Sequence, residues 1–400
     1  MRLSSSPHFT EGLTTQKIMA CVLISMLPEC VAAVVIFGLS ALVRIVVSVL
    51  GTVAFEAIFQ KCTKQKILVS NLSAAVSGVL LALVLSSTTP IWMILLGDLV
   101  AMVVAKGLFG GIGSNVFNPA LTGRAVLVMS FPAAIGARWY DPHLIPHIYE
   151  KLLAQGKTMA EIDAMSQATV WDGITAATTL SKVKAGTFVP DAATYWQLFI
   201  GNRAGCMGET SIMLLLISFA FLALTRIIDW RAPLAMVGTV VVCTFLGGIH
   251  AGVGAAGADV LTALLTGGLI FGATFMVTDY ATAPITGPGR LIFGAGCGLI
   301  TWLIRRFGGY PEGVMFSILI MNAVAPLLNN FTGRMYGYGK KGNRRPTPAK
   351  IVQTFDVQNA RPAAASNAVS ASNAVGADNS ASGEKNASGD SADGKTGGAK

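Results

Sequence analysis

Ten runs of predominantly apolar residues dominate the chain, and each approaches the roughly 20 residues that a helix needs to cross a bilayer. The sequence therefore predicts an all-α polytopic membrane protein with about ten transmembrane helices. The predicted spans are residues 17–38, 41–60, 67–87, 91–106, 119–136, 211–228, 233–250, 258–278, 291–304 and 314–328.

The overall composition points the same way. Apolar residues make up 53% of the chain and charged residues 12%, whereas about a quarter of an ordinary soluble domain is charged. The net charge of +9 could indicate nucleic acid, but the lysines and arginines gather in short loops and near the C-terminal end. We interpret them as topology signals, and we expect a lipid bilayer and no nucleic acid as partners.

Metal and hydrolytic chemistry find no support in the pattern of residues. The six cysteines form no CxxC pair and no cluster with histidine, so we predict no metal site in this chain. Only four histidines are present, and no nucleophile elbow accompanies them, which argues against a hydrolase.

A polar stretch divides the predicted spans into two groups of five. We therefore expect a cytoplasmic N-terminus (1–16), a first membrane half (17–136), an extracytoplasmic insert (137–209), a second membrane half (210–331) and a cytoplasmic tail (332–400). The end of the tail is rich in alanine, serine, asparagine and glycine and lacks aromatic residues, so we expect it to be largely disordered.

The orientation follows from the charges in the short loops. With the N-terminus inside, most loop lysines and arginines face the cytoplasm, whereas Arg44, Arg305 and Arg306 fall outside and count against the topology. Because five spans is an odd number, the second half is inverted relative to the first. The similarity of residues 107–120 and 306–326, each with a Phe-Gly-Gly followed by asparagine and proline, supports such a repeat.

Acidic residues within or beside the apolar runs are functional candidates, because a charge is costly in lipid. We interpret Glu56 as an interfacial carboxylate near Lys61. Asp98 and Asp279 instead flank backbone broken by glycine or proline, and we predict that they take part in ion coupling.

Two polar motifs stand out near the predicted insert. In the first, Asp172 precedes a hydroxyl-x-Ala-Thr tetrad that runs from Thr175 to Thr178 and offers a small hydroxyl to a modifying enzyme, although a Thr/Ala-rich loop is often only a loop. The second is a glycine-rich turn that leads directly into a helix, and its exposed N–H groups suit an anion. Its candidate cofactor-binding residues are Gly205, Gly208, Glu209 and Thr210.

Several separated motifs together resemble one family. They are Ser6-Pro7-His8, Gly97-Asp98, Lys106, Phe109-Gly110-Gly111, Asn115-x-Phe117-Asn118-Pro119-Ala120, Gly205 to Ser211, Trp230-Arg231-x-Pro233, Thr278-Asp279 and Tyr310-Pro311-Glu312-Gly313. In this order they are similar to the RnfD/NqrB family, whose RnfD members are membrane subunits of the Rnf ion-translocating ferredoxin:NAD oxidoreductase.

The resemblance implies a cofactor and a place for it. In the family, a flavin transferase attaches FMN through its phosphate to the last threonine of an Asp-x-x-[Ser/Thr]-x-Ala-Thr motif, which here is Thr178, with Asp172 and Thr175 completing the motif. Thr175 and Thr179 are the neighbouring hydroxyls that could be modified instead. Some relatives also hold a non-covalent riboflavin.

The resemblance also implies partners and a function. We expect a subunit of the cell (inner) membrane, in a complex with other Rnf subunits that include a second covalent-FMN subunit. Electron transfer between ferredoxin and NAD would drive sodium ion or proton transport. Two alternatives stay open: an NqrB-type subunit of a sodium-translocating NADH:quinone reductase, and a flavin-free channel or transporter.

Overall fold

The computed structural model describes residues 14–136, 139, 178–188, 191–201, 203–310 and 312–333. These residues form helices, turns and loops, and no strand occurs among them. Most of the predicted insert, the predicted tail, and the motif residues Asp172 and Thr175 lie outside the described residues.

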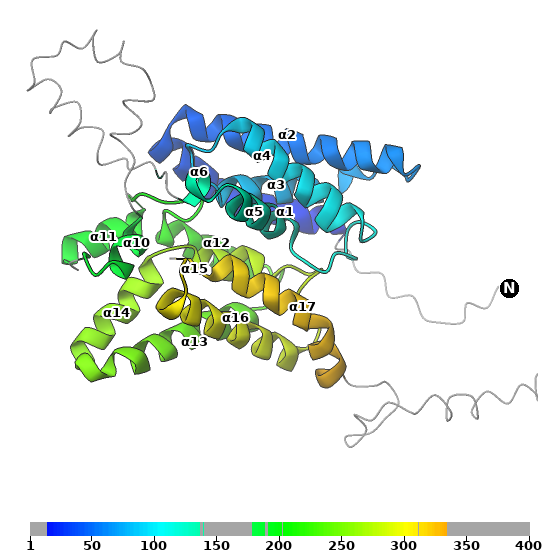
Figure 1. The fold of residues 1–400 in the computed structure, drawn as a ribbon. Helices are drawn as coiled ribbons and strands as arrows, with labels where there is room; N and C mark the ends of the chain where they lie inside the picture. The colour runs from blue at the N-terminus through cyan, green and yellow to red at the C-terminus, as the bar shows by residue number, and fades with distance from the viewer. Residues whose placement is uncertain are drawn as a thin grey trace, which may run out of the picture. The chain divides into compact units, whose positions relative to one another are not determined.

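The helices fall into two groups in chain order (Figure 1). Before the insert lie α1 (Thr15–Phe37), α2 (Leu39–Cys62), η1 (Val69–Asn71), α3 (Ser73–Leu83), α4 (Ile91–Leu99), η2 (Val100–Gly107), α5 (Pro119–Ser130) and α6 (Pro132–Gly136). After it lie α10 (Thr179–Lys184), α11 (Ala192–Ile200), α12 (Ile212–Leu224), α13 (Arg231–Gly248), η3 (Ile249–Ala251), α14 (Val253–Leu265), α15 (Leu269–Phe271), η4 (Gly272–Met276), α16 (Gly287–Phe307) and α17 (Val314–Thr332).

Five described helices are long and apolar enough to cross a membrane: α1, α2, α13, α16 and α17. A sixth span results if α14 is joined to α15 and η4, although the two parts meet at an angle of 61°. α3 and α12 are apolar but shorter, with 11 and 13 residues. The described part of the chain is therefore all-helical with several membrane-spanning helices, as predicted.

Capping residues set where several helices begin. The Thr14 hydroxyl accepts a hydrogen bond from the Lys17 N–H at the start of α1, and the Asn118 side chain accepts one from Leu121 at the start of α5. In α5, Pro119 follows the cap, where the missing N–H costs nothing. These caps satisfy backbone N–H groups that have no partner within the helix.

Close backbone contacts at glycine join the helices within each group. A Cβ on Gly123 of α5 would lie 2.7 Å from the carbonyl oxygen of Gly97 in α4, so these helices touch through backbone. Gly294 of α16 lies in the same way against the backbone of Ala232 in α13. Small residues at such crossings are typical of helix pairs in membranes.

One buried ion pair differs from the sequence-based interpretation. The Glu56 carboxylate does not lie at an interface beside Lys61: its Oε1 is 2.7 Å from the Lys106 ammonium, and both side chains are at least 94% buried. Lys106 also donates to the Ser73 hydroxyl at 2.7 Å. The interfacial interpretation was wrong because it considered only neighbours in sequence, whereas α2 packs against η2.

Candidate functional site

Thr178 directly precedes α10 and forms its N-cap. Its Oγ1 accepts a hydrogen bond from the Ser181 N–H at 3.2 Å and lies 2.8 Å from the Ser181 hydroxyl. Lys184, at the other end of α10, donates to the carbonyls of Gly308 and Tyr310 after α16. Thr178 is only partly buried, so its hydroxyl lies near the surface, and the contacts with Ser181 hold it in place.

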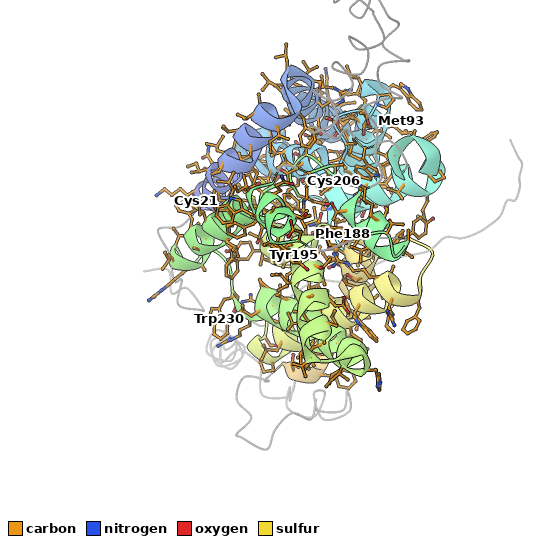
Figure 2. All side chains as sticks on the ribbon, turned by 90° about the vertical axis from the view of Figure 1, so that its left-hand side faces the viewer. Cys21, Met93, Phe188, Tyr195, Cys206 and Trp230 are labelled. Carbon is orange, nitrogen blue, oxygen red and sulfur yellow. The ribbon has the colours of Figure 1, made fainter. Side chains whose placement is uncertain are left out.

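A cavity of about 50 Å³ lies beside this threonine. Its lining combines Thr178 with residues from the glycine-rich turn, among them Gly205 and Glu209. The structure thus brings together the two polar motifs that the sequence places separately. Figure 2 shows Cys206, another lining residue, among the packed side chains at the centre of the view.

Charged side chains are buried around the cavity. The Arg124 guanidinium of α5 lies 3.3 Å from the Glu209 carboxylate and donates to the Cys206 sulfur at 3.4 Å. The Arg305 guanidinium of α16 lies 3.1 Å from the carboxylate of Glu312, which also lines the cavity. With Arg203, these two ion pairs form what we name the charge cluster: Arg124, Arg203, Glu209, Arg305 and Glu312.

The charge cluster also satisfies backbone groups at the break between α14 and α15. Arg203 donates to the carbonyls of Leu265 and Glu209, and Arg305 donates to the carbonyls of Ala263 at 2.9 Å and Thr266 at 3.3 Å. The last carbonyls of a helix have no partners within the helix, and lipid offers none. The arginines supply the missing donors.

The two carboxyl groups of the charge cluster differ in their electrostatics. Burial raises the pKa of Glu209, although the Arg124 guanidinium acts against it. Burial also acts to raise the pKa of Glu312, but the Arg305 guanidinium and the Gly268 N–H hold it below its usual value. Glu209 is therefore the carboxylate of the pair that takes up a proton more readily.

Two backbone N–H groups of the glycine-rich turn, which we predicted to suit an anion, already have partners in the protein. The N–H of Met207 donates to the Leu85 carbonyl at 3.1 Å, and that of Gly208 donates to the Leu83 carbonyl at 2.7 Å. These donors are already taken by the end of α3. Gly208 must be glycine, because a Cβ there would lie 2.6 Å from the Leu83 side chain. The nearby Thr210 hydroxyl is buried.

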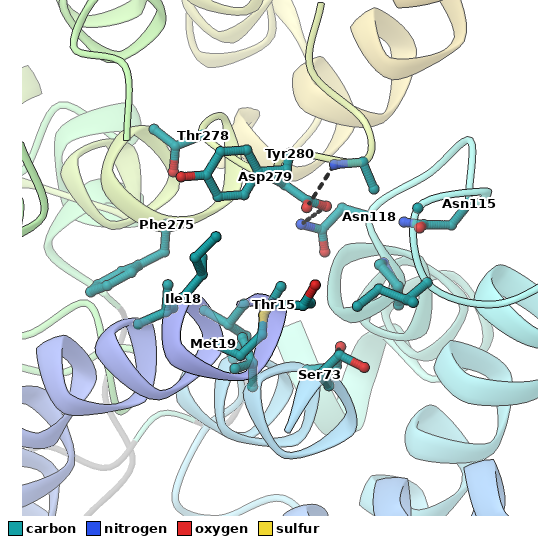
Figure 3. Close-up of a pocket in the computed structure, with 18 of the residues that line it drawn as sticks. Thr15, Ile18, Met19, Ser73, Asn115, Asn118, Phe275, Thr278, Asp279 and Tyr280 are labelled. Atoms are coloured by element: carbon teal, nitrogen blue, oxygen red, sulfur yellow. Dashed lines mark hydrogen bonds between the residues drawn. The ribbon is translucent and has the colours of Figure 1, made fainter. Parts of the chain in front are cut away.

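A second, larger cavity of about 400 Å³ contains Asp279 (Figure 3). The Asn118 amide donates to the Asp279 carboxylate at 3.4 Å, which links α5 to the segment after η4. Asn115 and Ser73 also line this cavity, and Lys106 of the buried ion pair contributes to its wall. Its size lies in the range of about 300 to 1,000 Å³ that is usual for small-molecule sites.

Asp98 lies apart from both cavities, buried between helices. Its Oδ1 accepts a hydrogen bond from the Ser48 hydroxyl of α2 at 2.7 Å, whereas Oδ2 has no partner among the described residues. A Cβ on Gly51 would lie 2.7 Å from that oxygen, so the glycine leaves room for the carboxylate.

The arginines of the charge cluster were not among the predicted site residues. Arg124 gave a usable signal, because an arginine in the middle of an apolar run needs a buried partner. The partners of Arg203 and Arg305 could not be identified from the sequence, because these arginines bind carbonyls that are freed where α14 ends. Within the described residues, no group of three or more His, Cys, Asp or Glu side chains could hold a metal ion.

Similar known proteins and the matching family model all point to one family. The chain is 38% identical over 343 residues to the D subunit of the Na⁺-translocating ferredoxin:NAD⁺ oxidoreductase complex of Acetobacterium woodii, covering 85% of this chain and 96% of that protein. It is 38% identical over 330 residues to the proton-translocating counterpart of Clostridium ljungdahlii, covering 82% and 94%. It is 37% identical over 350 residues to the D subunit of the ion-translocating oxidoreductase complex of Citrobacter koseri, covering 84% and 99%. The model of the NQR2, RnfD, RnfE family matches residues 2–337, and the chain therefore belongs to that family.

Proposed function

We propose that this protein is the RnfD subunit of an Rnf-type complex, in which electron transfer between ferredoxin and NAD is coupled to sodium ion or proton transport across the cell (inner) membrane. The identity of 37 to 38% with relatives of that function, over most of each chain, is the observation that carries the proposal. The names of these relatives describe multi-subunit complexes, so the chain works together with other Rnf subunits.

We further propose that Thr178 carries FMN through a phosphate ester on its Oγ1. The residues fit: Thr178 is held as the N-cap of α10, partly exposed, beside a cavity with buried arginines. FMN supplies one- or two-electron transfer when it is bound. Asp172 and Thr175 complete the motif for the flavin transferase, and the insert faces outward, toward a partner subunit with its own covalent FMN.

The covalent flavin has a direct test. The protein, expressed with its flavin transferase and denatured, should show a fluorescent flavin band on a gel, and the peptide that contains Thr178 should carry the mass of FMN. Thr178→Ala should abolish both signals, whereas Thr179→Ala should leave them. A band that survives Thr178→Ala would refute the assignment.

The larger cavity fits the non-covalent riboflavin that we predict from the family resemblance. Its size suits a flavin, and Asn115, Asn118 and Ser73 place polar groups in its wall. Denaturing the purified protein should release riboflavin that is not covalently bound. Asn115→Leu should lower the released amount and leave the covalent flavin band unchanged.

We propose ten spans in two inverted halves of five. Helix is present in each of the ten predicted apolar runs. The two groups also share a contact pattern: α2 packs against α3 and α4 as α13 packs against α14 and α16. Cysteine labelling from the outside should modify a cysteine placed in the insert and spare one placed in residues 107–118. The reverse result would refute this topology.

Asp98 and Asp279 stay our candidates for ion coupling. Asp98 is fully buried with one oxygen that lacks a partner among the described residues, which suits a group that binds a cation or proton transiently. Asp98→Asn keeps the size of the side chain and removes its charge. In membrane vesicles, we expect this variant to lower ion transport more than electron transfer; wild-type levels of both would exclude the role.

Two other functions can be separated from this one. An NqrB-type subunit would support quinone reduction rather than ferredoxin-dependent NAD reduction in purified complex. A flavin-free channel or transporter would give no flavin band at Thr178.

A further inference from the structure

The charge cluster contains three guanidinium groups and two carboxylates, which leaves one positive charge without a carboxylate partner. Arg203 is the arginine of the cluster that makes no ion pair: it is 6% exposed and donates only to backbone carbonyls within the described part of the chain, although Glu209 and Glu312 line the same cavity. A buried charge without a counterion is strongly unfavourable. The site therefore calls for one negative charge from a bound group.

The size of the cavity beside Arg203 limits what this group can be. About 50 Å³ holds more than one water molecule, since one needs roughly 10 to 15 Å³, but it is far below the roughly 300 Å³ at which small-molecule sites begin. A Cβ added at Gly205, which lines the cavity, would meet no atom within 4 Å, so the space continues over this glycine. A phosphoryl group fits, whereas a flavin ring does not.

We propose that Arg203, with Arg124 beside it, binds the phosphodiester that joins FMN to Thr178. This inference rests on the proposed attachment of FMN to Thr178. A phosphodiester carries a single negative charge, which equals the unmatched charge of the cluster. The Arg124 Nε has no acceptor among the described residues and the side chain lines the same cavity, so a second donor is ready for a phosphate oxygen. The flavin ring lies outside the cavity.

Inorganic phosphate can test this site in the full-length protein. The protein is purified in detergent from cells with and without the flavin transferase, and its thermal midpoint is measured as phosphate replaces chloride at constant ionic strength. Phosphate should raise the midpoint of the unflavinylated protein by roughly 2 °C or more, because a ligand of the folded state stabilises it. It should leave the flavinylated protein unchanged, because the phosphodiester already fills the site.

Variants assign the effect to one side chain. Arg203→Gln should lose the response to phosphate and Arg203→Lys should keep most of it. Arg306→Gln removes an exposed arginine one position from the charge cluster and should respond as wild type does. If Arg203→Gln does not fold, the difference in phosphate response between flavinylated and unflavinylated wild-type protein still tests whether the phosphodiester occupies the site.

Two results would overturn the proposal: an equal response of both forms to phosphate, or no response of the unflavinylated form. The mass of the Thr178 peptide is measured separately. An unmodified peptide from cells that contain the transferase contradicts the attachment of FMN itself, whereas a modified peptide with no phosphate response contradicts only the role of Arg203.

Discussion

Breaking the ion pair between Glu56 and Lys106 should destabilise the protein strongly. The two groups are 2.7 Å apart and at least 94% buried, so Lys106→Met would leave the Glu56 carboxylate buried without a cation, and Gln60 is its remaining hydrogen-bond partner within the described ranges. Removing one partner of a buried pair costs about 3 to 5 kcal/mol. This corresponds to a loss of roughly two to four powers of ten in the folding equilibrium.

The double variant decides whether the cost comes from the unpaired charge. Glu56→Leu combined with Lys106→Met removes both charges, and it should be more stable than Lys106→Met alone, because no charge is left without a partner. Unfolding of the purified protein by sodium dodecyl sulfate, followed by helical circular dichroism, measures each free energy. Lys61→Met is the control, because Lys61 is exposed and forms no ion pair with Glu56 among the described residues.

The reasoning fails under either of two outcomes. If the double variant loses as much free energy as the sum of the two single variants, the groups do not interact. If Lys61→Met destabilises the protein as much as Lys106→Met does, Glu56 belongs to the interface as the sequence first indicated.

Two further predictions concern packing and docking. Gly123→Val should prevent the protein from folding stably, because its Cβ would lie 2.7 Å from the Gly97 carbonyl oxygen. Gly238→Ala should stay folded, because a Cβ there meets no atom within 4 Å. Size-exclusion chromatography in detergent measures how much of each variant is folded. Lys184→Met should free α10 from the carbonyls after α16 and speed cleavage of the insert by chymotrypsin. Lys182→Met is the control and should not change the cleavage rate. Equal cleavage rates of the two variants would contradict the contact between Lys184 and these carbonyls.

The helical segments could be predicted from sequence because apolar length is a local property. All ten predicted runs contain helix, and the Asn118-Pro119 start of α5 follows from its cap and proline. The run 258–278 was predicted as one span, but it contains the end of α14, a break at residues 266–268 and the helices α15 and η4. Gly267 and Gly268 mark that break in the sequence, yet glycine is also common in unbroken membrane helices.

The pairing of charges could not be predicted, because each partner is distant along the chain. Arg305 was counted as an outside charge against the topology. It is bound to Glu312 and to the end of α14, so it is not a loop charge of the kind that indicates orientation. Lys106, at the end of the fourth predicted span, is buried with Glu56. The positive-inside rule concerns charges in water, so it misjudges those that the fold buries.

The break in the second group of helices and the charge cluster require one another. The last carbonyls of a helix have no partners within the helix and need donors from elsewhere. At the end of α14, those carbonyls bind Arg203 and Arg305, and the Gly268 N–H beyond the break donates to Glu312 at 3.0 Å. An unbroken helix would satisfy its own backbone and leave the arginines without acceptors, whereas a break without arginines would leave the carbonyls unpaired. The position of the break therefore determines where the arginines are buried, which is beside Thr178.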